Sequence, residues 1–588
     1  MSARPSTAAP FRDARYARRR LEVERRAGGE LVLANPTPYA TAFQTTDAAL
    51  AHWADAAPER VWLAERSGGG WRTVAFGEAR ARIEALAGGL HELGVVGRRP
   101  LLILARNGID HALIAYAAMS QGMPVAPVSP QYGLPGANLA RLGHALALLD
   151  PAAVYTEDAS LFAAGLGAEG VAALPVIAGR NPRPRDIPLE RLMQAHPVRA
   201  TARPDDHAKY LLTSGSTGHP KAVICTHRNI ALNSAQIDAC FDDPDPPVMI
   251  NAAPWSHSLG ANSILHMALH RGGTLHIDAG QPTAERFGET VRNLREVATT
   301  YHNMVPAGWM LLADELERDD ALARRFFERV RVLQYGGSAL GQAVADRIQA
   351  VAIRTVGERI SFASGYGATE TGPTACNVHW TNDRMGMIGL PVPGTAVRLV
   401  PQSGKFDFRV KGPQVTPGYL GAEASFDDEG FYVLRDAARL VDPDDPAQGL
   451  IFDGRLSENF KLASGAFVGV GDLRVRAVSA MGGAVTDAVV CGEGREAVGL
   501  LLYPNPRLPR AEVEAAVRDA LERLNAAPYG GGGRIGRALV LDDAPDPAAG
   551  EITDKGYIAQ TLARTLRAAA IARLFADPPA PDVMVFSP

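Results

Sequence analysis

Two hydrophobic patterns alternate along the first two thirds of the chain. Short runs that are apolar throughout, such as PLLILAR at 100–106 and RVLQYGG at 331–337, predict strands buried on both faces. Stretches such as 108–122 and 340–354 place apolar residues three and four positions apart, which predicts helices. Such strands separated by helices predict parallel sheets covered on both faces, so the expected fold class is α/β. The other expected strands lie at 123–128, 152–157, 173–179, 207–213, 247–253 and 272–278.

The pattern changes after residue 386. Shorter strand candidates bounded by Gly and Pro run to about residue 454 and predict a β-rich subdomain. Beyond Arg455, two apolar strands, a helix at 510–527 and a further strand at 536–543 predict a small α+β domain. We therefore expect an N-terminal domain over 1–454, with α/β subdomains to about 385 and the β-rich subdomain over about 386–454, and a C-terminal α+β domain over 455–588. The amphipathic stretch 557–575 predicts one final helix.

Composition agrees with a multidomain globular protein. The chain has 588 residues, which is too long for one core, with 46% hydrophobic and 21% charged residues. The formal net charge is -4, and no Lys/Arg stripe with interleaved aromatic residues is present in the sequence. This charge pattern disfavours nucleic acid as a partner.

The cysteines and the N-terminus bear on location. The four cysteines form no CxxC or Cys/His ligand spacing, so neither a disulfide framework nor a zinc site is indicated. The basic first 26 residues lack an apolar segment of signal-peptide length, and no window reaches about 18 apolar residues. We expect a cytoplasmic protein without a membrane span.

A short polar loop is the first candidate for chemistry. The stretch YLLTSGSTGHPKAVICTH at 210–227 places a Ser/Thr/Gly cluster after a strand and a lysine shortly behind it. Backbone N–H groups and hydroxyls in such a loop can bind an anion. The common phosphate loop GxxxxGK[ST] does not fit, because Gly215 and Gly218 are too close and Ala222 follows Lys221. Taken alone, the cluster is also compatible with a solvated turn.

Further motifs give the loop a context. The loop resembles the phosphate-loop signature of the adenylate-forming superfamily, which includes acyl- and aryl-CoA synthetases. Six more stretches follow in that family's order, and together the motifs cover about residues 50–560: PWSHSLGAN (254–262), YGGSAL (335–340), GYGATETGP (365–373), FYVLRDAAR (431–439), FDGRLSENFK (452–461) and GEITDKGYI (550–558). Members activate a carboxylate with ATP to give an acyl-adenylate and pyrophosphate, and a thiol then displaces AMP.

The resemblance implies roles at the phosphates of ATP. Lys221 would help to neutralise pyrophosphate, Thr369 would bind the α-phosphate, and Glu370 would hold Mg²⁺. The loop residues implied in wrapping the β- and γ-phosphates are Thr213, Ser214, Gly215, Ser216, Thr217 and Gly218.

It also implies an adenosine site. Tyr366 would cover one face of the adenine, and a turn the other, since glycine allows close approach of the backbone. Asp436 would bind the ribose hydroxyls with support from Arg455, although LRDAAR departs from the usual Thr-Gly-Asp. The turn consists of Gly336, Gly337 and Ser338.

The remaining implied residues concern the reacting groups and the domain motion. Lys555 would bridge the attacking carboxylate and the ribose, and His257 would orient the carboxylate and gate the thiol tunnel. Ser457 stands at the hinge position, where Asp or Lys is usual, and would let the C-terminal domain rotate as a mobile lid. Lys461 and Gly465 would line the coenzyme A tunnel, in a segment that departs from the family pattern.

Within the superfamily, 452–477, 550–558 and 101–132 resemble the feruloyl-CoA synthetase branch of bacterial aryl-CoA ligases. The implied substrates are a hydroxycinnamic acid such as ferulic acid, ATP and coenzyme A, with Mg²⁺ as cofactor. Dimers are common among relatives, so the resemblance allows a homodimer. Three alternatives stay open: a ligase for fatty or benzoic acids, transfer of the acyl group to a carrier protein, and a non-catalytic adenylate-binding relative.

Overall fold

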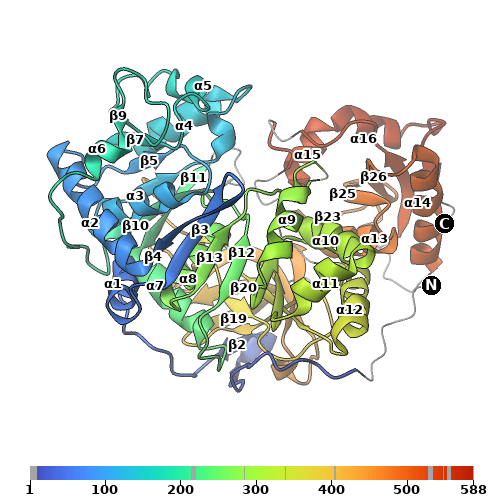
Figure 1. The fold of residues 1–588 in the computed structure, drawn as a ribbon. Helices are drawn as coiled ribbons and strands as arrows, with labels where there is room; N and C mark the ends of the chain where they lie inside the picture. The colour runs from blue at the N-terminus through green and yellow to red at the C-terminus, as the bar shows by residue number, and fades with distance from the viewer. Residues whose placement is uncertain are drawn as a thin grey trace.

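The computed structural model describes residues 9–213, 220–283, 285–337, 340–402, 405–456, 458–526, 534–546, 549–552 and 558–586, without the side chain of Asp472. The α/β prediction is confirmed: strands and covering helices alternate through the first two thirds of the chain, and a smaller sheet with its own helices forms the last part (Figure 1). None of the helices in these ranges combines the length and the apolar character that a bilayer crossing requires.

A seven-stranded sheet forms in the order β11-β10-β6-β5-β7-β8-β9. Its strands pair in parallel except for β10 and β11, which run antiparallel on either side of the polar loop. The strands are β5 (Leu101–Ile103), β6 (Val125–Pro127), β7 (Ala153–Thr156), β8 (Val176–Ala178), β9 (Ile187–Pro188), β10 (His207–Thr213) and β11 (Lys221–Thr226). α3 (Ile109–Ser120) is buried along almost its whole length, as its continuous apolar sequence predicts.

A four-stranded sheet in the order β12-β13-β3-β4 shares a core with the first sheet. Its strands are β3 (Val61–Ser67), β4 (Gly70–Ala75), β12 (Val248–Asn251) and β13 (Thr274–Ile277). Besides α3, the helices around these two sheets are α1 (Thr46–Ala56), α2 (Phe76–Glu92), α4 (Leu139–Leu149), α5 (Ala163–Leu166), α6 (Leu189–Leu192), α7 (His227–Asp238) and α8 (Leu265–His270), the last preceded by a π-helical turn at Leu259–Ile264.

An eleven-stranded sheet runs in the order β1-β2-β19-β20-β21-β22-β18-β17-β16-β15-β14. The β-rich segment after residue 386 is therefore continuous with the parallel strands before it. Its strands are β1 (Glu22–Arg25), β2 (Leu31–Ala34), β14 (Tyr301–Met304), β15 (Val332–Tyr335), β16 (Ser361–Tyr366), β17 (Cys376–Asn377), β18 (Met387–Pro391), β19 (Ala396–Gln402), β20 (Lys405–Lys411), β21 (Tyr432–Leu440) and β22 (Leu450–Arg455).

The hydrophobic pattern did not reveal that β1 and β2 belong to this sheet. β2 pairs with β19, with Leu33 opposite Val397, a partner more than 360 residues away. The parallel part is covered by α9 (Phe287–Glu296), α10 (Pro306–Arg318), α11 (Asp320–Phe327) and α12 (Gln342–Val356), which share one apolar core.

The last part of the chain has its own four-stranded sheet. β25 (Val485–Cys491), β26 (Val498–Pro504), β27 (Ile535–Val540) and β28 (Met584–Val585) pair in that order. α13 (Val470–Ala480), α14 (Arg510–Ala526), α15 (Gln560–Leu566) and α16 (Ala568–Leu574) accompany it, after a small hairpin of β23 (Phe460–Lys461) and β24 (Phe467–Val468). The boundary at 454/455 stays a prediction.

The single final helix predicted over 557–575 is instead two helices that meet at Arg567. The Arg567 guanidinium donates to the Glu551 carboxylate, with Nε 2.7 Å from Oε1. Helical periodicity cannot predict this contact with Glu551, which lies at the junction of the two helices.

We predict that Gly389→Ala lowers the free energy of unfolding by about 3 kcal/mol, because of overpacking and a positive φ. A Cβ atom at Gly389, whose φ is +82°, would collide with the backbone of Asn377. Gly386 is the matched control, since its φ is +84° and a Cβ atom there meets nothing within 4 Å. Gly386→Ala should cost only about 1 kcal/mol. Urea unfolding measures both, and equal losses would contradict the argument.

Candidate active site

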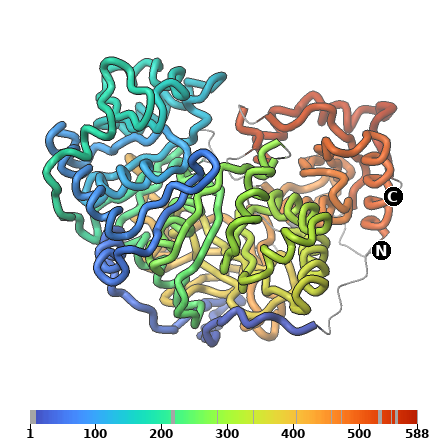
Figure 2. The backbone as a smooth tube through the Cα atoms, viewed as in Figure 1, coloured from blue at the N-terminus to red at the C-terminus, as the bar shows by residue number. Residues whose placement is uncertain are grey.

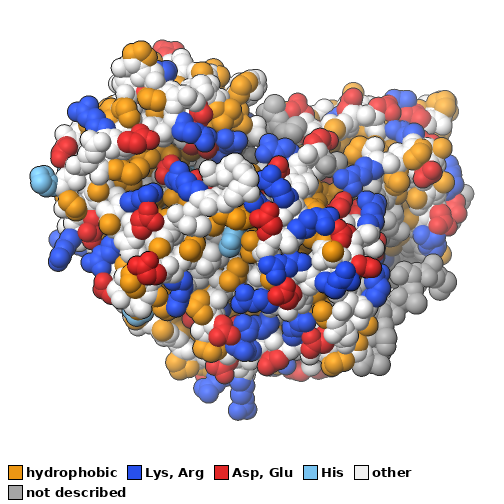
Figure 3. All heavy atoms as spheres, in the orientation of Figure 1, with side chains coloured by type: hydrophobic (Ala, Val, Ile, Leu, Met, Phe, Trp, Pro, Cys, Tyr) orange, Lys and Arg blue, Asp and Glu red, His pale blue; other side chains and the backbone are white. Residues whose placement is uncertain are grey.

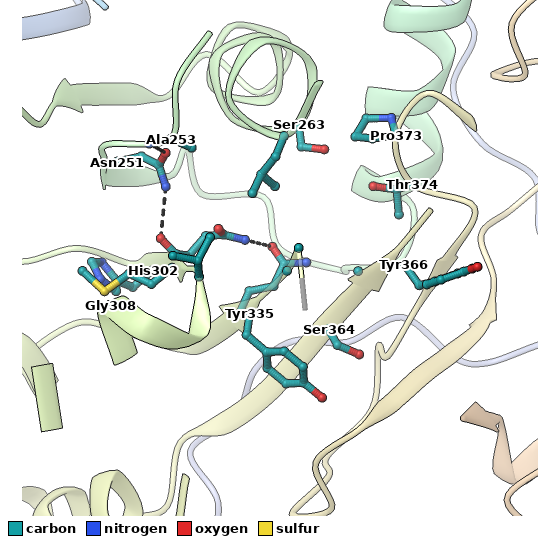
Figure 4. Close-up of a pocket in the computed structure, with 18 of the residues that line it drawn as sticks. Asn251, Ala253, Ser263, His302, Gly308, Tyr335, Ser364, Tyr366, Pro373 and Thr374 are labelled. Atoms are coloured by element: carbon teal, nitrogen blue, oxygen red, sulfur yellow. Dashed lines mark hydrogen bonds between the residues drawn. The ribbon is translucent and has the colours of Figure 1, made fainter. Parts of the chain in front are cut away.

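A cavity of about 420 Å³ runs along the parallel strands β14, β15 and β16, from the first residues of β14 and β15 to the carboxyl ends of the strands. Parallel strands collect their chain ends at one sheet edge, which is where α/β proteins bind ligands. Gly336 and Gly337, just after β15, and Tyr366, at the end of β16, line it. Figure 4 labels Tyr335, Ser364 and Tyr366 of these strands among the residues that line the cavity.

The predicted adenosine residues lie together. Tyr366 donates its hydroxyl hydrogen to Asp436 Oδ2 at 2.6 Å, and Arg455 Nε lies 3.7 Å from Asp436 Oδ1. All three line the cavity. Burial raises the pKa of Tyr366, and the Asp436 carboxylate raises it further, so the phenol stays protonated and can donate.

Irregular pairing in β21 surrounds Asp436. The register shifts between Phe408 and Arg409 on one side and between Asp436 and Ala438 on the other, and Arg435 has a φ of +61°. Bulges of this kind re-aim a side chain. The segment LRDAAR, which differs from the usual family motif, is thus also the irregular part of β21, where Asp436 contacts Tyr366.

A second group lies beside the cavity on neighbouring elements. The Thr369 hydroxyl is 3.1 Å from the Ser258 hydroxyl, and Ser258 and His257 both line the cavity. The Tyr419 hydroxyl donates to Glu370 Oε1 at 2.8 Å. Lys221 Nζ lies 5.1 Å from the centroid of the Tyr419 ring. Tyr419 therefore links the predicted metal ligand Glu370 to Lys221, a role the sequence did not reveal.

The donor set is compatible with Mg²⁺. In the described residues, no group of three or more His, Cys, Asp or Glu side chains could hold a metal ion. Mg²⁺ is commonly bound by one or two carboxylates together with substrate phosphates. Glu370, half-buried beside Thr369, fits the part of a single protein carboxylate.

Several predicted residues lie outside the described ranges. These are Ser214, Gly215, Ser216, Thr217, Gly218, Ser338, Ser457 and Lys555. Thr213 and Lys221 flank the loop and pair with each other across β10 and β11. The proposed roles of all these residues stay predictions.

The predicted tunnel residues lie apart from the cavity. Lys461 is in β23 and Gly465 is in the turn before β24, and neither is among the residues that line it. The C-terminal part instead contributes Arg474 of α13 together with Ile558 and Gln560. Arg474 also binds Asp487, with Nε 2.6 Å from Oδ1.

The approach of α13 depends on two glycines. A Cβ atom at Gly471 would lie 2.7 Å from the Cα atom of Gly454, so the helix start packs directly on the end of β22. In the sequence, the only sign of this contact was a glycine, Gly471, at the start of a stretch with helical periodicity.

A buried polar network lines the part of the cavity away from Asp436. Asn303 Nδ2 donates to Gln334 Oε1 at 2.8 Å, and the Tyr301 hydroxyl donates to the same oxygen. Asn251 Nδ2 donates to the Asn303 carbonyl at 3.0 Å (Figure 4). These contacts fix polar side chains in a largely apolar wall, and sequence analysis assigned none of them.

Lys209 connects β10, the strand before the polar loop, to the site. It is 3% exposed in β10, and Nζ donates to the Ala261 carbonyl at 2.9 Å and to Asn262 Oδ1 at 3.1 Å. Both acceptors belong to the π-helical turn that follows Ser258. Asn262 Nδ2 in turn donates to the Gly372 carbonyl at 3.5 Å. Burial lowers the pKa of Lys209 to about 8.

Comparisons with known proteins show the family to which the chain belongs. The family model described as AMP-binding enzyme matches residues 50–420, and that of the AMP-binding enzyme C-terminal domain matches residues 476–578. The chain therefore belongs to the AMP-binding enzyme family, within the adenylate-forming superfamily.

Individual relatives share only low sequence identity with this chain. 4-Coumarate–CoA ligase 5 of Oryza sativa subsp. japonica is 25% identical over 406 residues, covering 63% of this chain and 70% of the relative. A feruloyl-CoA synthase of Amycolatopsis is 26% identical over 370 residues, covering 60% and 67%. Together with the family match, these relatives support acyl- or aryl-CoA ligase activity through an acyl-adenylate.

Solved structures share the fold. An anthranilate CoA ligase in complex with anthranoyl-AMP aligns with a TM-score of 0.75 at 15% identity, covering 90% of this chain and 98% of that one. A benzoate CoA ligase from Burkholderia xenovorans LB400 aligns with a TM-score of 0.68 at 20% identity, covering 88% and 99%.

We predict that Lys209 makes stability rise with pH in the alkaline range. Between pH 8 and the ordinary pKa of 10.5, the unfolded chain keeps this proton while the folded chain has lost it. Unfolding free energy should therefore increase by up to about 3 kcal/mol across this range. Lys209→Met removes the effect, so the unfolding free energy of the wild type should increase relative to that of the variant as pH rises.

Urea unfolding at several pH values measures the difference. Lys411→Met, which removes an exposed ammonium group, is the matched control. A curve for Lys209→Met parallel to that of the wild type would refute the assignment.

Proposed function

We propose that the protein activates an aromatic acid of the hydroxycinnamic type, such as ferulic acid, with ATP and transfers the acyl group to coenzyme A. The observation that carries the proposal is one continuous cavity. It joins the Tyr366, Asp436 and Arg455 group to a pocket lined by Tyr301, Phe241 and other apolar or aromatic side chains. An adenylating enzyme needs both, since the acid must meet the α-phosphate.

In the first half-reaction, a carboxylate oxygen of the acid attacks the α-phosphorus of ATP and pyrophosphate leaves. Asp436 and Arg455 hold the ribose, and Tyr366 covers the adenine. Thr369 donates to the α-phosphate, and Lys221 neutralises the departing pyrophosphate. Mg²⁺, when bound at Glu370, offsets the charge of the phosphates.

In the second half-reaction, the thiol of coenzyme A attacks the acyl carbon and AMP leaves. His257, which lines the cavity next to Ser258, orients the carboxylate in the first half-reaction and gates the thiol tunnel in the second. Lys555 acts in the first half-reaction only, as the family resemblance implies. Ser457 is the hinge about which the C-terminal domain rotates between the two half-reactions. Lys461 and Gly465 line the thiol tunnel once the C-terminal domain has turned.

The hydroxycinnamic class rests on two supports. Relatives named for 4-coumarate and ferulate align with about two thirds of this chain or slightly less. In the polar network at Gln334 and Asn303, the buried Asn303 Oδ1 has no hydrogen-bond partner among the described residues, and such an acceptor in an apolar pocket suits a ring bearing a hydroxyl group. A plain fatty acid would leave this acceptor unpaired.

One assay tests the proposal. Purified protein is incubated with ATP, Mg²⁺, coenzyme A and a panel of cinnamic, benzoic and medium-chain acids, and AMP and thioester are measured by mass. The expected result is AMP and thioester with hydroxycinnamic acids in preference to the others. AMP without thioester would favour transfer to a carrier protein, and no AMP with any acid would favour a non-catalytic relative.

We predict that Lys555→Ala lowers adenylate formation 100-fold or more, since preorganised charge at the reacting centre commonly has an effect of this size. The variant should still convert a chemically prepared acyl-adenylate to the thioester. Pyrophosphate release measures the first step, and Lys411→Ala is the control. Near-normal pyrophosphate release by Lys555→Ala would refute this role.

A further inference from the structure

An N-terminal strap, residues 10–17, crosses the domain at the end of the cavity opposite the adenosine group. It precedes residue 50, where the family match begins. Phe11 forms a parallel bridge with Arg359, and Tyr16 forms an antiparallel bridge with Phe241. Figure 2 shows this blue segment running along the lower edge of the molecule towards the yellow-green helices.

Arg12 anchors the first half of the strap. Its Nη1 donates to the Phe327 carbonyl at 2.7 Å and to the Val330 carbonyl at 2.9 Å, at the end of α11. Its Nε lies 2.8 Å from Glu358 Oε2, and the side chain is only 17% exposed. Positive charge at a helix C-terminus is favourable, and the orphan carbonyls there gain a donor.

The second half is held as firmly. Arg15 Nη1 lies 2.8 Å from both Asp243 and Asp245. The Tyr16 hydroxyl donates to Ser361 Oγ at 3.0 Å, and the Tyr16 ring packs on Phe241 with centroids 5.5 Å apart. These contacts on both sides of Ala14 fix its position.

Ala14 lies between the two anchors and lines the cavity. It is 5% exposed and packs with Val332 and Ala363, near Tyr301 and Phe241. Tyr301 and Val332 are the first residues of β14 and β15, whereas Gly336 follows the last residue of β15. At a rise of about 3.3 Å per residue, the first and last residues of such a four-residue strand lie about 10 Å apart.

We propose that the N-terminal strap is the floor of the acid pocket and that Ala14 sets the length of acid the enzyme accepts. The carboxylate end of the substrate lies near Thr369 and the ring end points to the first residues of β14 and β15. The methyl group of Ala14 leaves room that a larger side chain would fill. The proposal rests on the proposed function for the orientation of the acid.

The test uses cinnamic acids extended at the para position: unsubstituted, 4-hydroxy, 4-methoxy and 4-ethoxy. Ala14→Leu should lower the kcat/KM ratio of 4-methoxycinnamate to cinnamate tenfold or more. Deletion of residues 1–17 should shift the ratio towards the longer acids. Because each ratio is taken within one preparation, partial unfolding of a variant cancels.

The matched control is Arg18→Ala, an exposed position next to the strap that does not line the cavity, and its ratio should equal that of the wild type. Ratios unchanged within twofold in both Ala14→Leu and the deletion would overturn the proposal.

Failure of the proposed function is recognised separately. If the wild type forms no AMP with any acid, the function is wrong, and thermal unfolding with the same acids then tests the floor by binding alone. The expected result is that stabilisation by 4-ethoxycinnamate, relative to cinnamate, is smaller in Ala14→Leu than in the wild type. Equal relative stabilisation in the two proteins would overturn the proposal that the strap is the floor of the pocket.

Discussion

The continuity of the eleven-stranded sheet is the constraint on which the candidate active site depends. β16 ends at Tyr366, and three intervening strands lead from it to β21, which carries Asp436. The sheet thereby brings two residues 70 positions apart to a hydrogen bond of 2.6 Å. A break anywhere in this ladder would separate the parallel half, which carries the residues predicted to bind adenine, from the antiparallel half, which carries the residues predicted to bind the ribose.

Buried polar groups set the shape of the cavity between these halves. Gln334 accepts from both Asn303 and Tyr301, so the amide cannot turn without leaving a buried donor unpaired. Lys209 does the same for the π-helical turn after Ser258, where its ammonium group holds the Ala261 carbonyl and Asn262. π-Helical turns are frequent at functional sites, and here one is fixed by a buried cation. The cost of burying these groups is offset only while the pairings persist, which makes the walls rigid.

The two ends of the cavity are covered by segments far from its middle in sequence. Ile558 and Gln560 of the C-terminal part line one end, and Ala14 lines the other. On the face of the molecule drawn in Figure 3, Lys and Arg side chains are interspersed with Asp and Glu. Ion pairs such as Arg15 with Asp243 hold individual segments in place.

The sequence by itself determined the α/β class, most strand positions and the order of the motifs, because hydrophobic periodicity and motif composition are local properties. β10 and α3 were predicted within about two residues for this reason. Only the tertiary structure decided that β2 pairs with β19, that Tyr366 meets Asp436, and that Ala14 lines the cavity. Each of these contacts joins distant residues through packing and hydrogen bonds, whose energy depends on the neighbours that folding supplies and leaves no periodic trace in the chain.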